Sequence, residues 1–206
     1  AAFTCALLNS QPMGFYAPAQ LVRDAQEHGV EVCRVDVNAS TWDNSIERDA
    51  HGCLRLRLGF RQIDGFREAW GKAIEAARTE TLFGSAEDLA RRAALPPSAL
   101  RKLADADAFG SLGQKRRDAV WEVRRTPSDQ LPLFAAMEAP ELGAEPDAAL
   151  PAMPLSEEVV ADYQTMRLSL KGHPLGFLRD AFAREGILSC ADANIAPDGR
   201  RAKVAG

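Results

Sequence analysis

The chain contains the stretch Ile63-Asp64-Gly65-Phe66-Arg67-Glu68-Ala69-Trp70-Gly71-Lys72-Ala73-Ile74. Residues 63–67 predict a tight turn, because Gly65 adopts backbone conformations that other residues avoid. A helix follows at once, and we expect it to run through Arg78. A turn that feeds directly into a helix is therefore the local structure that organises the middle of the chain.

This helical pattern repeats itself further along the chain. Ser85 is placed to cap a second helix that has acidic residues in its first turn. Pro96 and Pro97 begin a third helix. Asp107-Ala108-Phe109-Gly110 then predicts a second hairpin, before a helix from Leu112 to Arg124. We therefore expect helix, hairpin and helix, twice over.

The first turn resembles the helix-hairpin-helix motif, in which an apolar-x-Gly-apolar-Gly sequence starts a helix. Gly65, Phe66, Gly71 and Ile74 fit that motif, and Arg67 stands where its second glycine is usual. Glycine lets the backbone approach a phosphate, and free N–H groups at the helix start donate hydrogen bonds to it. The motif predicts DNA contacts at Gly65, Phe66, Arg67, Lys72 and Arg78. The alternative is an ordinary helical hairpin with a solvated basic face.

The second hairpin departs from the motif. Asp107 occupies the position where a glycine would help, and Phe109 and Leu112 are interpreted as core residues. The helix after it presents the cations Lys115, Arg116 and Arg117. Two interpretations of these three side chains stay open, because they either follow a DNA backbone or are solvated.

The charge of the chain is unevenly distributed. The formal net charge is −4, yet residues 55–125 hold 15 Lys or Arg against 10 Asp or Glu. Residues 126–162 hold 8 acidic residues and no basic ones. A basic block followed by an acidic one is compatible with nucleic-acid binding despite the negative total.

Four regions follow from these patterns, in a mainly α fold with short strands, that is, the α+β class. Residues 1–52 predict helices at Phe3 to Asn9 and Pro18 to Gly29 and a short strand within residues 30–37. Residues 53–125 begin with a strand at 53–58 and continue as the tandem helix-hairpin-helix region. Residues 126–155 form a Pro/acid-rich linker, and residues 156–206 form a helical connector. We expect that connector to hold a helix capped by Ser156, a helix from Pro174 to Arg184, and a strand from Lys203.

The linker carries six of the twelve prolines and one apolar peptide, Gln130-Leu131-Pro132-Leu133-Phe134. An extended Gln-Leu-x-Leu-Phe peptide resembles the bacterial sliding-clamp-binding motif. In that motif, the apolar side chains fill a pocket and the glutamine bonds at its rim. The predicted partner-binding residues are Gln130, Leu131, Leu133 and Phe134. The alternative is that these side chains attach the linker to the neighbouring domain.

Catalytic and metal-binding patterns are missing from the sequence. The four cysteines form no C-x-x-C pair, the three histidines lie at no ligand spacing, and no phosphate loop occurs. Asp36 and Asp43 are interpreted as structural, and His173 as a helix-entry residue. We predict no catalytic residue, no metal site and no membrane span, and a small metabolic enzyme has no site to support it.

The order of several segments resembles the late fingers region of bacterial C-family DNA polymerases, the DNA polymerase III alpha type. The segments are 6–16, 28–32 and 35–38, then 168–175, 198–201 and 204–206. The sequences of residues 9–16 and 168–174 resemble those of the error-prone, damage-response branch of that family. On this resemblance the chain is a piece of a longer protein that covers the end of the fingers, the helix-hairpin-helix pair, the clamp motif and the lead-in to a truncated OB domain.

That resemblance implies a cytoplasmic, template-directed nucleotidyl transfer in lesion bypass. The expected partners are primer-template duplex DNA, the sliding clamp and damage-response accessory proteins. Mg²⁺ is expected for the parent polymerase on palm aspartates that precede Ala1 in the family order, so no cofactor is predicted within this fragment. The alternative is a non-catalytic helix-hairpin-helix module of a repair or replication scaffold.

Overall fold

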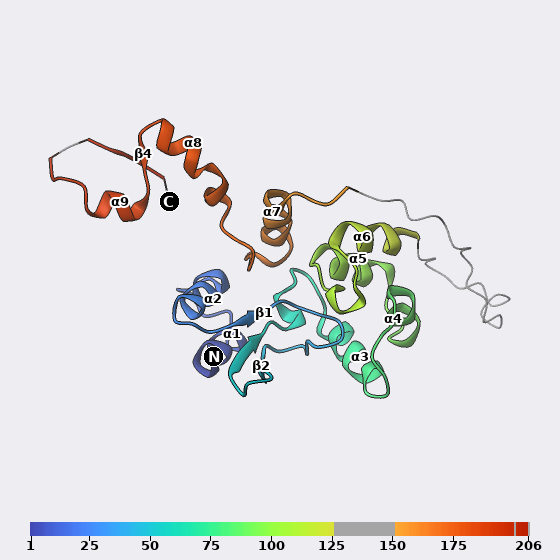
Figure 1. Ribbon diagram of the computed structural model, residues 1–206. Helices are drawn as coiled ribbons and strands as arrows, with labels where there is room; N and C mark the ends of the chain where they lie inside the picture. Colours follow the sequence, from blue (N-terminus) through green and yellow to red (C-terminus); the bar gives the residue numbers. More distant parts are fainter. Residues whose placement is uncertain (126–150, 200, 206) are drawn as a thin grey trace.

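The computed structural model describes residues 1–125, 151–199 and 201–205, and helices dominate it (Figure 1). Within those ranges, the strands are short and form one three-stranded and one two-stranded sheet. The expected mainly α fold with short strands is therefore confirmed. The predicted clamp-binding peptide, Gln130 to Phe134, lies outside the described residues.

The N-terminal part packs two helices beside the larger sheet. Its elements are α1 (Ala2–Asn9), α2 (Pro18–Glu27), β1 (Val32–Cys33), β2 (Ser45–Arg48) and β3 (Leu54–Arg57). β3 is the central strand, with β1 parallel on one side and β2 antiparallel on the other. The alternating side chains of β3 place Leu56 inside, where it is fully buried.

Two strands differ from the sequence-based expectation. β1 covers only two residues of the predicted strand at 30–37, and the chain beyond it buries Val35 and Val37 as a connection. β2 is not predicted by the sequence, because Ile46 is its one large apolar residue. Its pairing is supported by Arg57, whose Nε and Nη2 donate to the two carboxylate oxygens of Glu47 at 2.9 and 3.0 Å.

The helix-hairpin-helix region has the predicted order of elements. They are η1 (Phe60–Gln62), α3 (Glu68–Arg78), α4 (Ala86–Arg92), α5 (Pro97–Asp105), η2 (Gly110–Leu112) and α6 (Arg116–Arg125). Ser85 caps α4 as predicted, since its Oγ accepts a hydrogen bond from Asp88 N at 3.0 Å. The expected start of α6 at Leu112 was wrong: Leu112 ends η2, and Gly113 after it is in the left-handed conformation with a φ of +72°, so α6 begins at Arg116.

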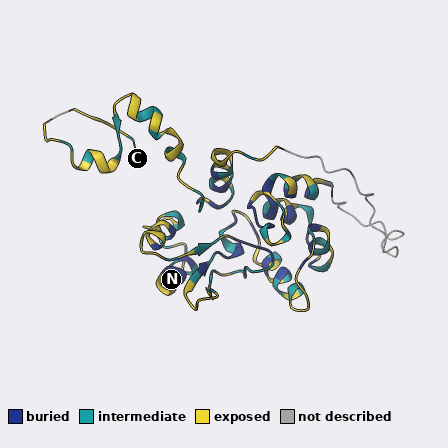
Figure 2. Cartoon of the chain, viewed as in Figure 1, coloured by how far each residue is buried: buried dark blue, intermediate teal, exposed yellow. Residues whose placement is uncertain are grey.

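One core joins these helices to the sheet. Leu56 of β3, Phe60 of η1, Ile74 of α3 and Leu103 of α5 are all fully buried and belong to the same cluster. Each such side chain contributes roughly 1.5 to 3 kcal/mol by its removal from water. Figure 2 shows the buried residues concentrated on the inner faces of these elements. The core therefore fixes α3, and the turn before it, relative to the sheet.

α7 (Leu155–Met166) follows the Pro/acid-rich linker and packs against α5. Its Asp162 forms an ion pair with Arg116 of α6, and both side chains are only 4% exposed. Arg116 Nη1 also donates to the carbonyl of Glu158 at 2.8 Å. The predicted N-cap, Ser156, was wrong: Pro154 caps α7 instead, and its carbonyl accepts from Glu158 N at 3.0 Å.

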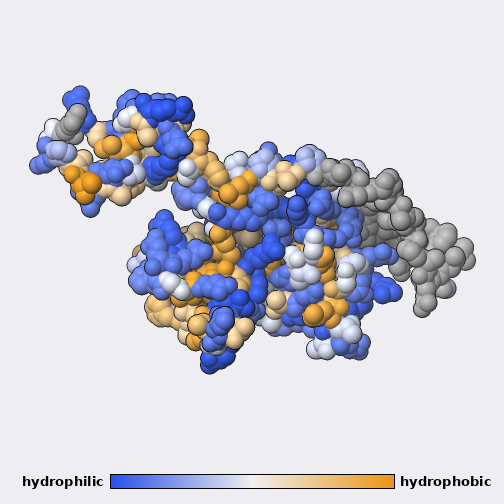
Figure 3. Space-filling model, in the orientation of Figure 1, coloured by the Kyte–Doolittle hydropathy of each residue, from blue (hydrophilic) through white to orange (hydrophobic). Residues whose placement is uncertain are grey.

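Most described residues from Pro174 onward are exposed and none is buried (Figure 2). This part contains η3 (Pro174–Leu178), α8 (Arg179–Arg184), β4 (Ile187–Leu188), α9 (Cys190–Asn194) and β5 (Lys203–Val204). The predicted helix from Pro174 to Arg184 is divided into a 3-10 helix, η3, and the α-helix α8, whereas the strand at Lys203 is confirmed. β5 pairs in parallel with β4, a strand that the sequence does not predict. Figure 3 shows hydrophilic and hydrophobic side chains side by side on this part.

Replacing Asp162 by alanine is expected to destabilise the protein by about 3 to 5 kcal/mol, because it leaves the buried guanidinium of Arg116 without its counter-charge. Urea unfolding measures the change. The control is Glu157→Ala, which removes a much more exposed partner of Arg117 and should cost at most about 1 kcal/mol. Equal losses in the two variants would contradict the role given to the buried pair.

Candidate nucleic-acid interface

The first hairpin turns sharply at Gly65. This residue is exposed and has a φ of +66°, a conformation that favours glycine. Phe66 N donates to the carbonyl of Ile63 at 3.0 Å and closes the turn. α3 then begins at Glu68, with Arg67 as an N-cap residue that makes no side-chain capping bond. The hairpin thus presents the start of a helix, where backbone N–H groups favour an anion.

An aromatic cluster anchors this hairpin in the core. Phe66 is 7% exposed and packs against Phe60 and Trp70, with ring centroids 5.8 and 5.3 Å away. The Arg67 guanidinium lies over the Trp70 ring, 4.9 Å from its centroid. Phe66 is therefore a core residue of the hairpin, whereas Arg67 is exposed beside it.

The two cations predicted along α3 have different environments. Lys72 is 56% exposed and approaches Glu75 at 3.7 Å. Arg78 Nη1 donates to the carbonyls of Val37 and Ser40 at 2.8 and 3.0 Å, and burial lowers the pKa of its guanidinium. Lys72 is thus accessible to a phosphate, while Arg78 is engaged in holding α3 against the sheet connection.

The second hairpin also has one residue in the left-handed conformation, but its environment is different. Asp107 takes the left-handed conformation, with a φ of +57°, where Gly65 does so in the first hairpin. Its carboxylate is buried and is bonded by Arg34 at 3.1 Å and by Lys171 at 2.9 Å. Phe109 is 1% exposed, which confirms its interpretation as a core residue. This hairpin therefore holds the fold together through the residue that replaces glycine.

The three cations after the second hairpin also lie in different environments. Lys115 is exposed. Arg117 donates to the carbonyl of Pro151 at 2.7 Å and to the Glu157 carboxylate at 3.2 Å. Arg116 lies in the buried pair described above, so its guanidinium is not accessible to DNA. The structure therefore corrects the prediction of a DNA contact at Arg116, whose burial depends on a partner 46 residues further along the chain.

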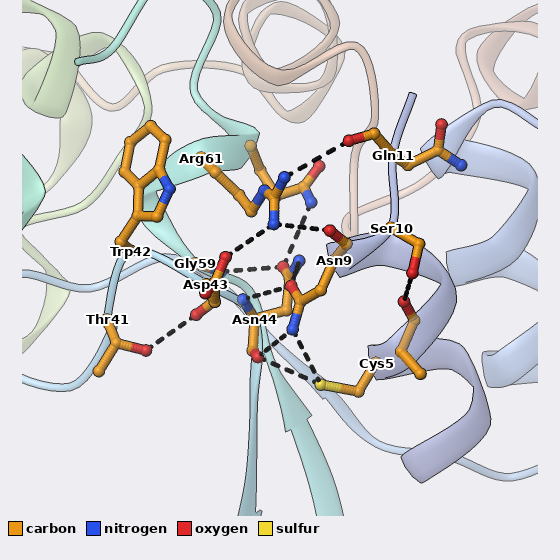
Figure 4. Close-up of polar contacts among 12 residues, drawn as sticks. Cys5, Asn9, Ser10, Gln11, Thr41, Trp42, Asp43, Asn44, Gly59 and Arg61 are labelled. Carbon is orange, nitrogen blue, oxygen red and sulfur yellow. Dashed lines mark hydrogen bonds and ion pairs between the residues drawn. The ribbon is translucent and has the colours of Figure 1, made fainter. Parts of the chain in front are cut away.

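A polar network supports the approach to the first hairpin (Figure 4). Asn44 N and Nδ2 donate to Asn9 Oδ1 at 2.8 and 2.7 Å, and Asn44 Oδ1 accepts from Gly59 N at 3.0 Å. Arg61 Nη1 donates to the Asn9 carbonyl at 2.8 Å and to Asp43 Oδ1 at 2.7 Å. The network joins α1 to η1, which precedes the hairpin. The sequence does not predict it, because single polar residues far apart in the chain carry no pattern.

The residues interpreted as non-catalytic have structural partners. Asp36 accepts hydrogen bonds from the backbone N of Asn38 and of Ser111, both at 2.8 Å. His173 caps η3, and its Nδ1 accepts from Leu175 N at 3.3 Å. Among the described residues, no group of three His, Cys, Asp or Glu side chains is placed to hold a metal ion. Within the same ranges, no helix has the length and apolar character that crossing a membrane requires.

The hairpin region is similar to a known motif family. Residues 29–119 match a family described as helix-hairpin-helix motif. This match spans the sheet, both hairpins and the start of α6.

Three relatives identify the larger protein to which the chain is similar. The error-prone DNA polymerase of Brucella abortus biovar 1 (strain 9-941) is 57% identical over 205 residues, which are 99% of this chain and 19% of that protein. Its counterpart in Rhodopseudomonas palustris (strain BisA53) is 53% identical over all of this chain and 20% of its own length. The error-prone DNA polymerase of Bradyrhizobium diazoefficiens is 44% identical over all of this chain and 22% of its own length.

The chain therefore is homologous, over its whole length, to one segment of the error-prone DNA polymerases. This confirms the resemblance predicted from residues 9–16 and 168–174. The chain spans about a fifth of the length of these relatives.

Gly65→Ala is expected to cost about 1 to 2 kcal/mol, because an added Cβ is strained at this positive φ and meets Lys102 Nζ at 3.0 Å. Thermal or urea unfolding measures the loss. Gly84→Ala is the matched control, since its Cβ would meet nothing within 4 Å and its φ is not in the left-handed region. If both variants unfolded alike, the turn would not require glycine.

Proposed function

We propose that this chain is a segment of an error-prone, DNA-directed DNA polymerase that carries out template-directed nucleotidyl transfer in lesion bypass. The observation that carries the proposal is the 57% identity to such a polymerase over 99% of the chain. The segment supplies a grip on duplex DNA and a tether to the sliding clamp. It works in the cytoplasm with damage-response accessory proteins.

The nucleotidyl transfer itself belongs to the whole protein in this proposal. Such a transfer needs carboxylates that hold Mg²⁺ ions, and the described residues offer no cluster of ligands for them. We therefore assign no catalytic step to the residues that the structure describes. Its contribution is to position the duplex and to keep the polymerase near its primer end.

The grip on DNA rests on the first hairpin and on nearby cations. The uncapped start of α3 offers backbone N–H groups to a phosphate, and the glycine at the turn leaves room for its approach. Arg67 at the N-cap of α3 and Lys72 within α3 are exposed, and Lys115 is exposed after the second hairpin. Contacts of this kind hold the phosphate backbone and read no bases, so the expected binding is independent of sequence.

The double variant Arg67→Gln, Lys72→Gln is expected to weaken binding to duplex DNA and to reduce the slope of log affinity against log salt by about two. Fluorescence anisotropy with a labelled duplex measures both quantities. The charge-matched control is Arg23→Gln, Arg184→Gln, on helices that Figure 1 shows apart from α3. Binding that ignores salt, or an equal loss in both double variants, would contradict a grip through α3.

The clamp tether is proposed for Gln130, Leu131, Leu133 and Phe134. Its support is the resemblance of the peptide to the clamp-binding motif and its place after the helix-hairpin-helix region. A tether of this kind raises the effective concentration of a polymerase at its primer end. Loss of the contact should therefore reduce processivity before it reduces the rate of single nucleotide addition.

The chain is expected to bind a purified bacterial sliding clamp in the micromolar range, about −8 kcal/mol, and to lose this binding in Leu133→Ala, Phe134→Ala. Fluorescence anisotropy follows the titration. Leu142→Ala, Leu150→Ala is the matched control, because it removes apolar side chains from the same region outside the predicted motif. Absence of binding by the unmodified chain would overturn the tether and favour a scaffold module.

A further inference from the structure

Three elements meet at the tip of the first hairpin. Asp64 N donates to the carbonyl of Thr165, in the last turn of α7, at 2.8 Å. Lys102 of α5 donates through Nζ to the carbonyl of Asp64 at 2.7 Å. Arg167, directly after α7, donates through Nη2 to the Asp64 carboxylate at 3.1 Å. The first hairpin is therefore contacted by residues of α5 and by residues at the end of α7.

The two added cations lie at the surface where a phosphate would approach. Lys102 Nζ is 3.0 Å from the point that a Cβ on Gly65 would occupy, so the ammonium lies directly against the turn. The Arg167 side chain is 74% exposed and that of its partner Asp64 is 58% exposed. An ion pair this open to water is held by little energy, so its guanidinium is free to exchange partners.

Backbone geometry sets Arg167 apart from ordinary surface arginines. It ends α7 in the left-handed conformation, with a φ of +61°, and its N donates to the carbonyl of Tyr163 at 3.2 Å. Glycine is the usual residue at such a helix end, because any other residue is strained in this conformation. The position nevertheless carries a long cation that reaches the hairpin.

The charges at the tip favour an anion. Three cations, Arg67, Lys102 and Arg167, belong to the turn and its contacts, and only two carboxylates, those of Asp64 and Glu68, oppose them. The uncapped start of α3 adds a partial positive charge. We propose that Lys102 and Arg167 contact the DNA backbone, so that a phosphate at the Gly65 hairpin is bound from α3, α5 and α7 together. This inference rests on the proposed function, and it extends the interface past residue 119, where the helix-hairpin-helix match ends.

Two substitutions on one ion pair separate DNA binding from a purely structural role. Arg167→Gln removes a phosphate contact, so it should weaken duplex binding and reduce the salt slope by about one. Asp64→Asn removes the competing carboxylate and frees Arg167, so it should tighten binding. A pair that only braces α7 would instead respond alike to both changes, because either substitution breaks it.

The experiment measures anisotropy of a labelled duplex against the whole chain across a salt series. Adding Lys102→Gln to Arg167→Gln should reduce the slope by about one more, while Arg167→Lys should restore most of the binding. Thermal unfolding of each variant confirms that it folds, and Arg23→Gln, Arg184→Gln controls for net charge. Weaker duplex binding in both Asp64→Asn and Arg167→Gln, or unchanged binding in both, would overturn the inference and leave the proposed function intact. An unmodified chain that does not bind duplex DNA would instead remove the proposed function, and this inference with it.

Discussion

The buried ion pair between Arg116 and Asp162 is the interaction on which the arrangement of the hairpins depends. Each charge is almost fully removed from water, a cost that only the partner and its further hydrogen bonds offset. The guanidinium bonds the Glu158 carbonyl, and Ser169 Oγ donates to the free carboxylate oxygen at 2.7 Å. The pair thereby fixes α7 on α6. With α7 in place, its last turn delivers Thr165 to the backbone of the first hairpin.

The two hairpins share one backbone feature but differ in the groups that they expose. Both place one residue in the left-handed conformation, Gly65 in the first and Asp107 in the second. Glycine leaves the first turn bare and exposed. Aspartate fills the second with a carboxylate that binds Arg34, before the sheet's central strand, and Lys171, after α7. The first hairpin therefore keeps an exposed turn, which Lys102 and Arg167 contact at the surface, whereas the second joins three parts of the chain through a buried carboxylate.

The sequence predicts what depends on neighbouring residues and misses what depends on distant ones. Ser85 and Pro97 mark the starts of their helices because caps and prolines act within one turn. Ser156 has the same local signature, yet α7 begins one residue earlier, at Leu155, with Pro154 at its N-cap. Arg116 resembles Lys115 in the sequence, and only the position of Asp162 separates the buried cation from the exposed one. The contribution of Arg167 to the hairpin was missed for the same reason, since 103 residues separate it from Asp64.

The net positive charge of residues 55–125 is larger than the positive charge that DNA would contact. Much of it is neutralised within the fold: Arg57 bonds Glu47, Arg92 bonds Asp88, and Arg116 bonds Asp162. The exposed cations near the first hairpin are few, and each phosphate contact adds only one step to the salt dependence. A grip of this size is weak at physiological salt. In the proposed polymerase, such a grip slides along the duplex without holding it. Residence at the primer end would then depend on a second contact, such as the proposed clamp peptide, through its effective concentration.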